Sequence, residues 1–386
     1  MAASLPPRGT LLQDVRTSCA RVTEASGIRI SEEAVDAFLA SLDRGAFAEH
    51  AAQHGLAFPL RFDTFAEEVN FIAVLSLLNA LSGYRNDFHQ ATGHGVFDSI
   101  RRLLLGLYLT PADDGVPPLS AKGLQGVRAA SLAQILGVST HTESQHPTLP
   151  FVTVGTVGGP LQEPLELLAT MCNDAGKFLD AHGKKDLGTY VLDAFADALA
   201  AAPEHIDSVL LGAIAQVPGF NDSTTVDFTP AYVMKKALYL VHALREKVAQ
   251  SPAGELPSAA AQMGAHWQSK DAAALPMFID NVIPTMLLYQ RVLDMSSSDV
   301  SALHAWSPDA SAPVLSGADA YRVRAGALTA GAQIVARAHA CAKTDEARAW
   351  LASLTEVGLD GYLWSSAKEP ALRAIPRLAE RGTGMY

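Results

Sequence analysis

The sequence has few cysteines and no long apolar run. Its three cysteines, Cys19, Cys172 and Cys341, are odd in number, far apart and without metal-ligand spacing. This argues against a disulfide framework and predicts reduced thiols in a reducing compartment. No stretch of about 18 consecutive apolar residues is present, and the N-terminal MAASLPPRG lacks the apolar core of a secretory signal. We therefore expect a cytoplasmic protein that does not enter a membrane.

Basic residues are also in the minority, with 29 lysines and arginines against 40 aspartates and glutamates and a net charge of -11. Binding along a nucleic-acid backbone depends on basic side chains that neutralise many phosphates. We therefore expect no direct binding to nucleic acid, whereas a small anionic ligand needs only a local basic pocket. The dinucleotide fingerprint, the phosphate loop, the nucleophile elbow and the zincin motif are missing too.

What the sequence does contain is a helical pattern. Apolar residues recur at spacings of three and four between Pro, Gly and Asp, without the strand and helix alternation of a Rossmann sheet. The length of 386 residues allows one large core without disulfides. We predict an all-α fold with a flexible segment over residues 1–14 and a single large helical domain over residues 15–386. One or two short strands are expected, one of them over residues 151–157.

Two helix starts are marked by capping patterns. Ser31 precedes two glutamates, and Thr64 stands three residues before Glu67, which forms a capping box. The helix that follows Thr64 carries apolar residues in nearly every direction around its axis, so we expect it to be central. Helices are predicted over residues 32–42, 69–81, 97–108, 165–181, 189–201, 230–248, 284–294, 325–342 and 345–354.

One carboxylate stands inside an apolar run. Asp280 lies within the sequence LPMFIDNVIP, residues 275–284, just before the helix that Pro284 begins. Burying a carboxylate alone costs several kcal/mol, so Asp280 must be capped, paired or functional. Spacing alone favours Asp280 or Asn281 as the cap of that helix. The functional alternative makes Asp280 a nucleophile or a stabilising anion for an oxocarbenium-like sugar.

A second stretch places two lysines near the start of a helix. Lys235 and Lys236 could hold a phosphate as point charges, although neighbouring lysines on an amphipathic helix are more often solvated. Lys235, Tyr239 and His242 share one face at helical spacing. Position alone leaves both interpretations of the lysines open.

A third stretch, residues 79–89, crowds polar, aromatic and cationic groups at the end of the apolar helix. It is typical of a cleft wall, where Tyr84 could stack on a base and Arg85 could hold an anion. The alternative, to which we give equal weight, is a glycine-terminated helix followed by a polar loop with satisfied hydrogen bonds.

Several short motifs follow one another in a specific order. They are Leu78-Asn79 through Tyr84-Arg85, Lys235-Lys236-Ala237, Phe278-Ile279-Asp280 with Ile283-Pro284, Arg324-Ala325, Leu359-Asp360-Gly361-Tyr362-Leu363-Trp364, and Tyr386. In this order they resemble the queuosine salvage family, also described as queuosine 5′-phosphate N-glycosylase or hydrolase, and particularly its fungal branch. Together these motifs extend over nearly the whole chain.

The resemblance implies an all-helical fold related to DNA glycosylases, and hydrolysis of the bond between ribose 5-phosphate and a modified deazaguanine base. By that analogy Asp280 is the catalytic carboxylate, Lys235 and Lys236 lie near the ribose phosphate or the carboxylates of the site, and Asn79 and Tyr84 line the base pocket. The remaining substrate-binding residues are expected to be Arg85, Phe278, Asn281 and Arg324. No cofactor and no metal are called for, because loss of the base requires only positioned charge and water.

The sequence departs from the family pattern near these motifs. Ser82 and Gly83 replace an aromatic pair, Arg322 stands where an acidic residue is usual, and Thr285 replaces a glutamine. These changes leave Asp280 intact but alter groups expected to choose the base. The reaction class is therefore better supported than the identity of the substrate.

Two other classes of function are compatible with the sequence. A non-catalytic binder of nucleotides or modified bases would keep the pocket and tolerate Asp280→Asn. A helical interaction protein would use Asp280 only as a cap, so that Asp280→Ala would lower stability without a specific loss of turnover. The order of the motifs favours the enzyme, whose partner is a small-molecule nucleotide, and leaves the oligomeric state open.

Overall fold

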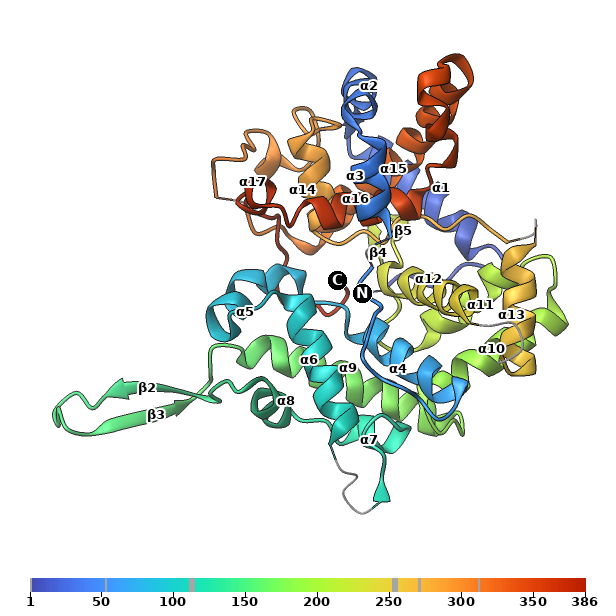
Figure 1. Ribbon diagram of the computed structural model, residues 1–386. Coiled ribbons are helices and arrows are strands. Elements are labelled where there is room, and N and C mark those ends of the chain that lie inside the picture. Colours follow the sequence, from blue (N-terminus) through green and yellow to red (C-terminus); the bar gives the residue numbers. More distant parts are fainter. Residues whose placement is uncertain (1, 53, 111–114, 252–255, 270–271, 312) are drawn as a thin grey trace. The chain divides into compact units, whose positions relative to one another are not determined.

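The computed structural model describes residues 2–52, 54–110, 115–251, 256–269, 272–311 and 313–386. Helices dominate these residues, whose sheets are three antiparallel strand pairs, β1–β6, β2–β3 and β4–β5 (Figure 1). The all-α prediction is therefore confirmed, with three short strand pairs where one or two short strands were expected.

The chain divides into two compact units, where a single domain over residues 15–386 was expected. The first unit contains Met1–Phe62, Ala194–Gln216 and Phe220–Glu380, and the second contains Asp63–Asp193, Val217–Gly219 and Arg381–Tyr386. Helix α1 begins at Leu11, inside the segment 1–14 that was expected to be flexible, and Leu11 and Leu12 are buried.

The first unit is arranged around a long helix, α15 (Gly317–Thr344), against which α1, α2, α14, α16 and η4 pack. Its other helices are α1 (Leu11–Ala25), α2 (Glu32–Ser41), α3 (Arg44–Ala51), α11 (Ile206–Gln216), α12 (Lys235–Gln250), α13 (Ser258–Gln268), α14 (Val282–Tyr289), η3 (Ser301–Leu303), η4 (Glu346–Ser353), α16 (Glu356–Ser366) and α17 (Pro370–Arg373). Its strands are β1 (Arg29–Ile30), β4 (Ser223–Val226), β5 (Thr229–Tyr232) and β6 (Leu293–Asp294).

The second unit contains the predicted apolar helix as α4 (Phe65–Leu78), whose residues from Val69 onwards are buried, as expected. Helix α9 (Gln162–Ala181) packs against α4, α7 and α8, and the β2–β3 hairpin extends away from the helices of its unit (Figure 1). The remaining elements are η1 (Ser82–Tyr84), α5 (Arg85–Thr92), α6 (Val96–Leu109), α7 (Ala121–Gln125), α8 (Ala129–Leu136), β2 (His141–Gln145), β3 (Thr153–Val157) and α10 (Leu187–Ala201), which continues into the first unit.

Both predicted caps are present. The Ser31 hydroxyl accepts a hydrogen bond from the Ala34 N–H at 3.2 Å, and the Thr64 hydroxyl accepts one from the Glu67 N–H at 3.1 Å. The Glu67 carboxylate bonds back to the N–H of Asp63 at 3.2 Å, one residue earlier than a standard capping box. Each cap is expected to contribute about 1 kcal/mol to helix stability.

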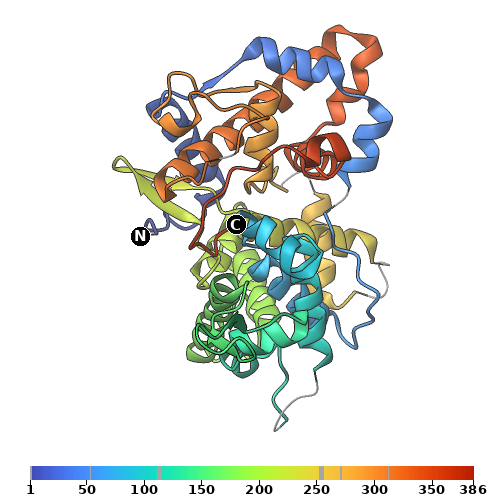
Figure 2. The same cartoon turned by 90° about the vertical axis from the view of Figure 1, so that its left-hand side faces the viewer.

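The predicted helix start at Pro230 was wrong because residues around it form a hairpin. Strands β4 and β5 pair from Ser223 opposite Tyr232 to Val226 opposite Thr229 (Figure 2). Asp227 and Phe228 in its turn have positive φ angles of 46° and 66°, as a tight two-residue hairpin turn requires. Met234, with φ of 54°, then redirects the chain into α12.

The predicted helix over residues 284–294 was also displaced. Helix α14 ends at Tyr289, and Arg291 adopts a positive φ of 59°. Leu293–Asp294 then pairs with Arg29–Ile30 in the β1–β6 sheet. The last predicted helix, over residues 345–354, is the 3-10 helix η4.

Among the described residues, no single helix combines the length and apolar character needed to cross a membrane. One bent pair, Phe65–Leu78 with Ser82–Thr92, satisfies the length and composition criteria together, with a 62° angle between its helices. The first helix of that pair is the buried α4, and buried core helices have the same apolar composition.

Candidate functional site

The candidate carboxylate lies in the Asp280 segment, residues 273–281, which connects α13 to α14 without regular secondary structure. Residues 275–281 are buried, although no strand pairs with them. A buried backbone outside helices and sheets needs other hydrogen-bond partners. Charged side chains from five helices of the first unit supply many of them.

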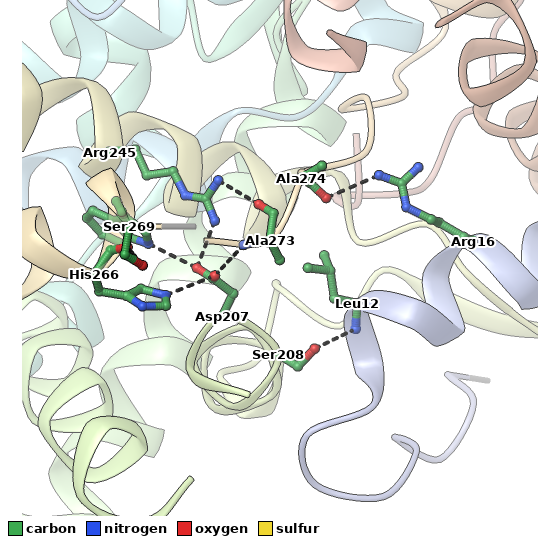
Figure 3. Close-up of polar contacts among 10 residues, drawn as sticks. Leu12, Arg16, Asp207, Ser208, Arg245, His266, Ser269, Ala273 and Ala274 are labelled. Atoms are coloured by element: carbon green, nitrogen blue, oxygen red, sulfur yellow. Dashed lines mark hydrogen bonds and ion pairs between the residues drawn. The ribbon is translucent and has the colours of Figure 1, made fainter. Parts of the chain in front are cut away.

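The start of this segment is held by the Asp207 network, which consists of Asp207, Arg245, His266, Trp267 and Ala273. Figure 3 labels Asp207, Arg245, His266 and Ala273. The buried Asp207 carboxylate accepts hydrogen bonds from Arg245 at 2.7 Å, Trp267 at 2.9 Å, His266 at 3.0 Å and the Ala273 N–H at 3.0 Å. Arg245 also donates to the Ala273 carbonyl at 2.9 Å. Burial opposes ionisation of Asp207, but Arg245 and the other donors outweigh it and hold its pKa below the usual value.

Arg16 on α1 contacts the next residue of the segment. Its guanidinium donates to the Ala274 carbonyl at 3.1 Å, as Figure 3 shows, and forms an ion pair with Glu356 on α16. Burial raises the pKa of Glu356 even beside Arg16. These contacts tie α1 and α16 to the segment that leads to Asp280.

A buried ion pair holds the residue before Asp280. Arg324 donates to both carboxylate oxygens of Asp222, at 2.9 and 2.5 Å, and to the Ile279 carbonyl at 3.0 and 2.8 Å. Asp222 also accepts bonds from the Tyr321 hydroxyl at 2.8 Å and the Lys235 N–H at 3.1 Å. Burial opposes ionisation of Asp222, but Arg324 outweighs it and lowers the pKa. Arg324, which was predicted to bind substrate, is therefore placed to position the segment.

Asp280 caps helix α14. Its Oδ1 accepts hydrogen bonds from the N–H groups of Val282 at 2.7 Å and Ile283 at 3.3 Å. The capping interpretation is therefore confirmed through Asp280. Asn281 occupies the N-cap position without a side-chain capping bond, and its amide donates to the Leu378 carbonyl at 2.6 Å. A cap also orients a carboxylate, so this contact fits a catalytic role as well as a structural one.

Two further ionisable groups interact electrostatically with Asp280, and with it form what we call the ionisable cluster: Lys235, Asp280 and Asp360. Burial lowers the pKa of Lys235 to about 8, although the charge of Asp280 opposes this. Asp360 on α16 accepts a hydrogen bond from the Phe278 N–H at 2.8 Å. Burial first, and then the charge of Asp280, raise the pKa of Asp360 well above its usual value.

The same face of α12 continues from the cluster into aromatic side chains. Tyr239 and His242 lie one and two turns after Lys235, and all three are buried, as is Phe278. The Phe278 ring centre is 5.3 Å from that of His242 and 5.9 Å from that of Tyr239. His54 completes the group, with its ring centre 4.4 Å from that of His242. The Tyr239 hydroxyl donates to the His54 carbonyl at 2.9 Å.

Lys236 is fully buried and Lys235 is only 5% exposed, so the solvated interpretation of the two lysines was wrong. That interpretation assumed an amphipathic helix, whereas residues 235–244 of α12 are buried in every direction. Burial alone does not assign a ligand to either lysine.

Asn79, Tyr84 and Arg85 belong to the second unit, whereas the other predicted site residues belong to the first. Tyr84 is buried, its hydroxyl accepts the Gly382 N–H at 2.8 Å, and the Arg381 guanidinium lies 4.9 Å from its ring centre. These contacts favour the structural alternative for Tyr84, because they anchor the C-terminal residues. Asn79 ends α4 and Arg85 begins α5, and both are half-buried.

Two departures from the family pattern also have protein partners. The Thr285 hydroxyl donates to the Asn281 carbonyl at 2.7 Å and accepts the Leu378 N–H at 3.1 Å. Arg322 forms ion pairs with Asp227 at 2.5 Å and Asp319 at 2.8 Å. Thr285 therefore supports the backbone beside Asp280, and Arg322 braces the β4–β5 turn.

Asp222, Asp360 and His54 were not predicted as site residues. Asp360 carried a usable signal, because it is a lone carboxylate among apolar residues in the same way as Asp280. Asp222 and His54 stand in polar, glycine-containing stretches, where spacing gives no indication of burial. Only the tertiary structure brings them to α12.

Comparison with known proteins gives no match: no family model matches the chain, and no curated protein does. Within the described residues, no group of three or more His, Cys, Asp or Glu side chains is placed to hold a metal ion.

Proposed function

We propose that this chain is an N-ribohydrolase that cleaves the N-glycosidic bond of queuosine 5′-phosphate, or of a related modified nucleotide. Its products are queuine and ribose 5-phosphate, which serve salvage of the tRNA-modifying base. The proposal places the enzyme in the cytoplasm, acting on a small molecule without a cofactor and without direct contact to nucleic acid. It rests on the motif resemblance together with the chemistry of the ionisable cluster.

The observation that carries the proposal is the burial of three electrostatically interacting ionisable groups, Lys235, Asp280 and Asp360. Burial and the charge of Asp280 raise the pKa of Asp360, and burial lowers that of Lys235 to about 8. Neighbouring ionisable groups whose environments displace their pKa values are typical of acid–base sites. The paired carboxylates Asp207 and Asp222 have lowered pKa values instead, which is typical of structural ion pairs.

In the proposed reaction, Asp280 stabilises the sugar. Departure of the base gives the ribose oxocarbenium character, and a carboxylate interacts more strongly with that cation than with the neutral substrate. The two N–H groups of α14 hold the carboxylate in place, and the helix N-terminus favours its negative charge. Asp280 would therefore act as a nucleophile or as an electrostatic stabiliser at the anomeric carbon.

Asp360 would act as the acid. Its raised pKa keeps the carboxyl group protonated to higher pH than an ordinary aspartate. As the glycosidic C–N bond breaks, this proton would pass to the departing base. A water molecule would then supply its oxygen to the sugar carbon and return a proton to Asp360. Lys235, with a pKa of about 8, is mostly protonated at neutral pH and would attract the anionic phosphate.

A non-catalytic nucleotide binder is the second candidate, and the cap made by Asp280 favours it. If the carboxylate serves only to begin α14, asparagine can replace it, because asparagine caps helices equally well. The two functions therefore differ in their response to Asp280→Asn.

The test is release of free base from queuosine 5′-monophosphate by the purified protein, compared with Asp280→Asn and Asp280→Ala. We expect turnover by the wild type and a loss on the order of 100-fold or more in both variants. Asp280→Asn should unfold near the wild-type temperature, whereas Asp280→Ala should lose about 1 kcal/mol of stability with its cap.

Asp43 offers a matched control. It caps α3 by accepting the Ala46 N–H at 2.8 Å, at an exposed position. Asp43→Ala should lower stability by a similar amount, about 1 kcal/mol, and retain full turnover. Wild-type protein that binds the nucleotide without cleaving it would favour the binder, and undiminished turnover by Asp280→Asn would remove Asp280 from the chemistry.

A further inference from the structure

Two histidines, the half-buried His54 and the buried His242, carry buried ring nitrogens without a partner. The Nε2 atoms of His54 and His242 are buried and make no hydrogen bond, and His242 is only 6% exposed. Buried polar atoms are nearly always hydrogen-bonded, because an unpaired one is costly. Phenylalanine would fill a similar volume without that cost. The two imidazoles, which we call the histidine pair, therefore require an explanation other than packing.

The histidine pair adjoins all three elements that carry the ionisable cluster. His242 follows Lys235 by seven residues on one face of α12, about 10 Å along the helix. Phe278, two residues before Asp280, packs against both imidazoles, at 5.3 and 6.0 Å between ring centres. His54 approaches α16 so closely that a Cβ added to Gly361, the residue after Asp360, would lie 3.0 Å from its Cε1.

The tautomer of His54 follows from its other contact. A hydrogen bond to the backbone of Val357 favours the protonated ring, so a carbonyl is the acceptor. Because Nε2 is unpartnered, Nδ1 donates this bond. Burial lowers the pKa of His54 to about 4, so the ring is neutral at pH 7 and Nε2 presents a lone pair. His54 is thus set as a hydrogen-bond acceptor.

We propose that the histidine pair and Phe278 form the subsite for the departing base, and that this subsite selects a planar heterocycle offering an N–H donor to His54 Nε2. This subsite rests on the proposed function, and it assigns the residues that would contact the base. Amino-substituted purine-like bases of the guanine and 7-deazaguanine class meet the requirement. The ribose and phosphate then extend along α12 toward Asp280 and Lys235.

The experiment compares His54→Phe and His242→Phe with the wild type. Binding of free queuine and 7-deazaguanine is measured by calorimetry, turnover of queuosine 5′-monophosphate by base release, and stability by thermal unfolding. Each substitution removes an unpaired polar atom but keeps a ring. We expect about tenfold weaker base binding for each variant. His242→Phe should keep or raise the melting temperature, whereas His54→Phe also gives up the bond to the Val357 carbonyl.

His50→Phe is the matched control in the same part of the chain. Both ring nitrogens of His50 have partners, Ser365 at 3.1 Å and Glu369 at 3.2 Å. This substitution should lower the melting temperature and leave base binding unchanged. His54→Gln, which returns a hydrogen-bonding atom near the Nε2 position, should recover part of the binding lost in His54→Phe.

The outcomes separate the subsite from the enzyme. If the wild type releases base, and His54→Phe and His242→Phe bind the free base as tightly as the wild type and His50→Phe do, the subsite is overturned and the hydrolase proposal stands. Absence of both turnover and base binding in the wild type would overturn both. Weaker base binding with retained or increased stability is the result that a packing role does not produce.

Discussion

Buried charge in the first unit is organised in two ways. In the Asp207 network and the Asp222–Arg324 pair, each carboxylate is bonded to an arginine, and its pKa is lowered against the effect of burial. In the ionisable cluster, burial prevails, so that the pKa of Asp360 is raised and that of Lys235 falls to about 8. The first arrangement stabilises the fold. The ionisable cluster lowers the free energy of unfolding. Groups that persist despite such a cost are expected where function requires them.

The largest predicted effect on stability comes from breaking a carboxylate–arginine pair. Asp222→Asn should leave the Arg324 guanidinium buried without its counter-charge and lower the free energy of unfolding by about 3–5 kcal/mol. Urea unfolding at pH 7 measures this. The comparison variant is Asp360→Asn, which removes a carboxyl group whose pKa burial raises, and it should match or exceed wild-type stability while losing turnover. Equal destabilisation by both substitutions would show that the two arrangements do not differ.

A somewhat smaller effect of opposite sign is expected for Lys235→Met. The folded pKa of about 8 lies below the ordinary value of 10.5, so the protonated lysine destabilises the native state at neutral pH. The stability that this group contributes is present above pH 10.5 and is lost as the pH falls toward 8. Replacing it should raise the free energy of unfolding at pH 7 by up to about 3 kcal/mol. Base release should fall at the same time.

The same substitution tests the comparison directly. Urea unfolding at pH 7 and at pH 10 should show that the stability advantage of Lys235→Met over the wild type largely disappears at pH 10. Other groups, such as Cys19, whose pKa burial raises to about 12, lower the stability of both proteins alike over that interval. A marked loss of stability at pH 7 would instead make Lys235 a structural partner of Asp280 and Asp360.

The sequence predicted the helical class and the buried position of Asp280, but not the contrast between the two arrangements. An isolated carboxylate in the apolar run 275–284 is enough to indicate burial or capping. The local sequence does not specify which residues of other elements contact this segment. Asp222 and Asp360 lie 58 residues before and 80 residues after Asp280, and only packing of α12 and α16 against the segment joins them.

The two lysines illustrate why the helix around them was misjudged. Helical periodicity predicts an exposed face for Lys235 and Lys236, but α12 is buried over its first ten residues. Its start was misplaced because a hairpin turn at Asp227 and Phe228, neither of them glycine, gave no turn signal. The β4–β5 pairing and the buried cation both override local propensity.

The histidine pair should make stability depend on pH, which the carboxylate–arginine pairs should not do in the same interval. Burial lowers the pKa of His54 to about 4 and that of His242 to about 3, from 6.5, and the charges of His54 and then of Arg245 add to the shift of His242. The stability that depends on neutral imidazoles is present above pH 6.5 and is lost as the pH falls toward these values. From pH 6.5 to 5, each histidine should account for about 2 kcal/mol.

Urea unfolding at these two pH values tests this loss, and His242→Phe should remove about half of it. Asp207 and Asp222, whose pKa values are lowered, should contribute nothing to the change in this interval. A loss of stability on acidification that persists in the double variant His54→Phe, His242→Phe would place the titration elsewhere, because Asp360 and Glu356, whose pKa values burial raises, change stability in the opposite direction.

The smallest predicted effect comes from an exposed ion pair that is bidentate like the buried one. Arg337 donates to both oxygens of Asp36, at 2.6 and 2.7 Å, just as Arg324 does to Asp222. Solvent and salt screen the exposed pair, so Arg337→Met should leave the urea midpoint unchanged within error. If it lowered stability as much as Asp222→Asn, bidentate geometry rather than burial would set the strength of these pairs. If Arg337→Met leaves stability unchanged, the Asp222–Arg324 pair owes its strength to burial. Burial is also what displaces the pKa values of Lys235 and Asp360 beside Asp280.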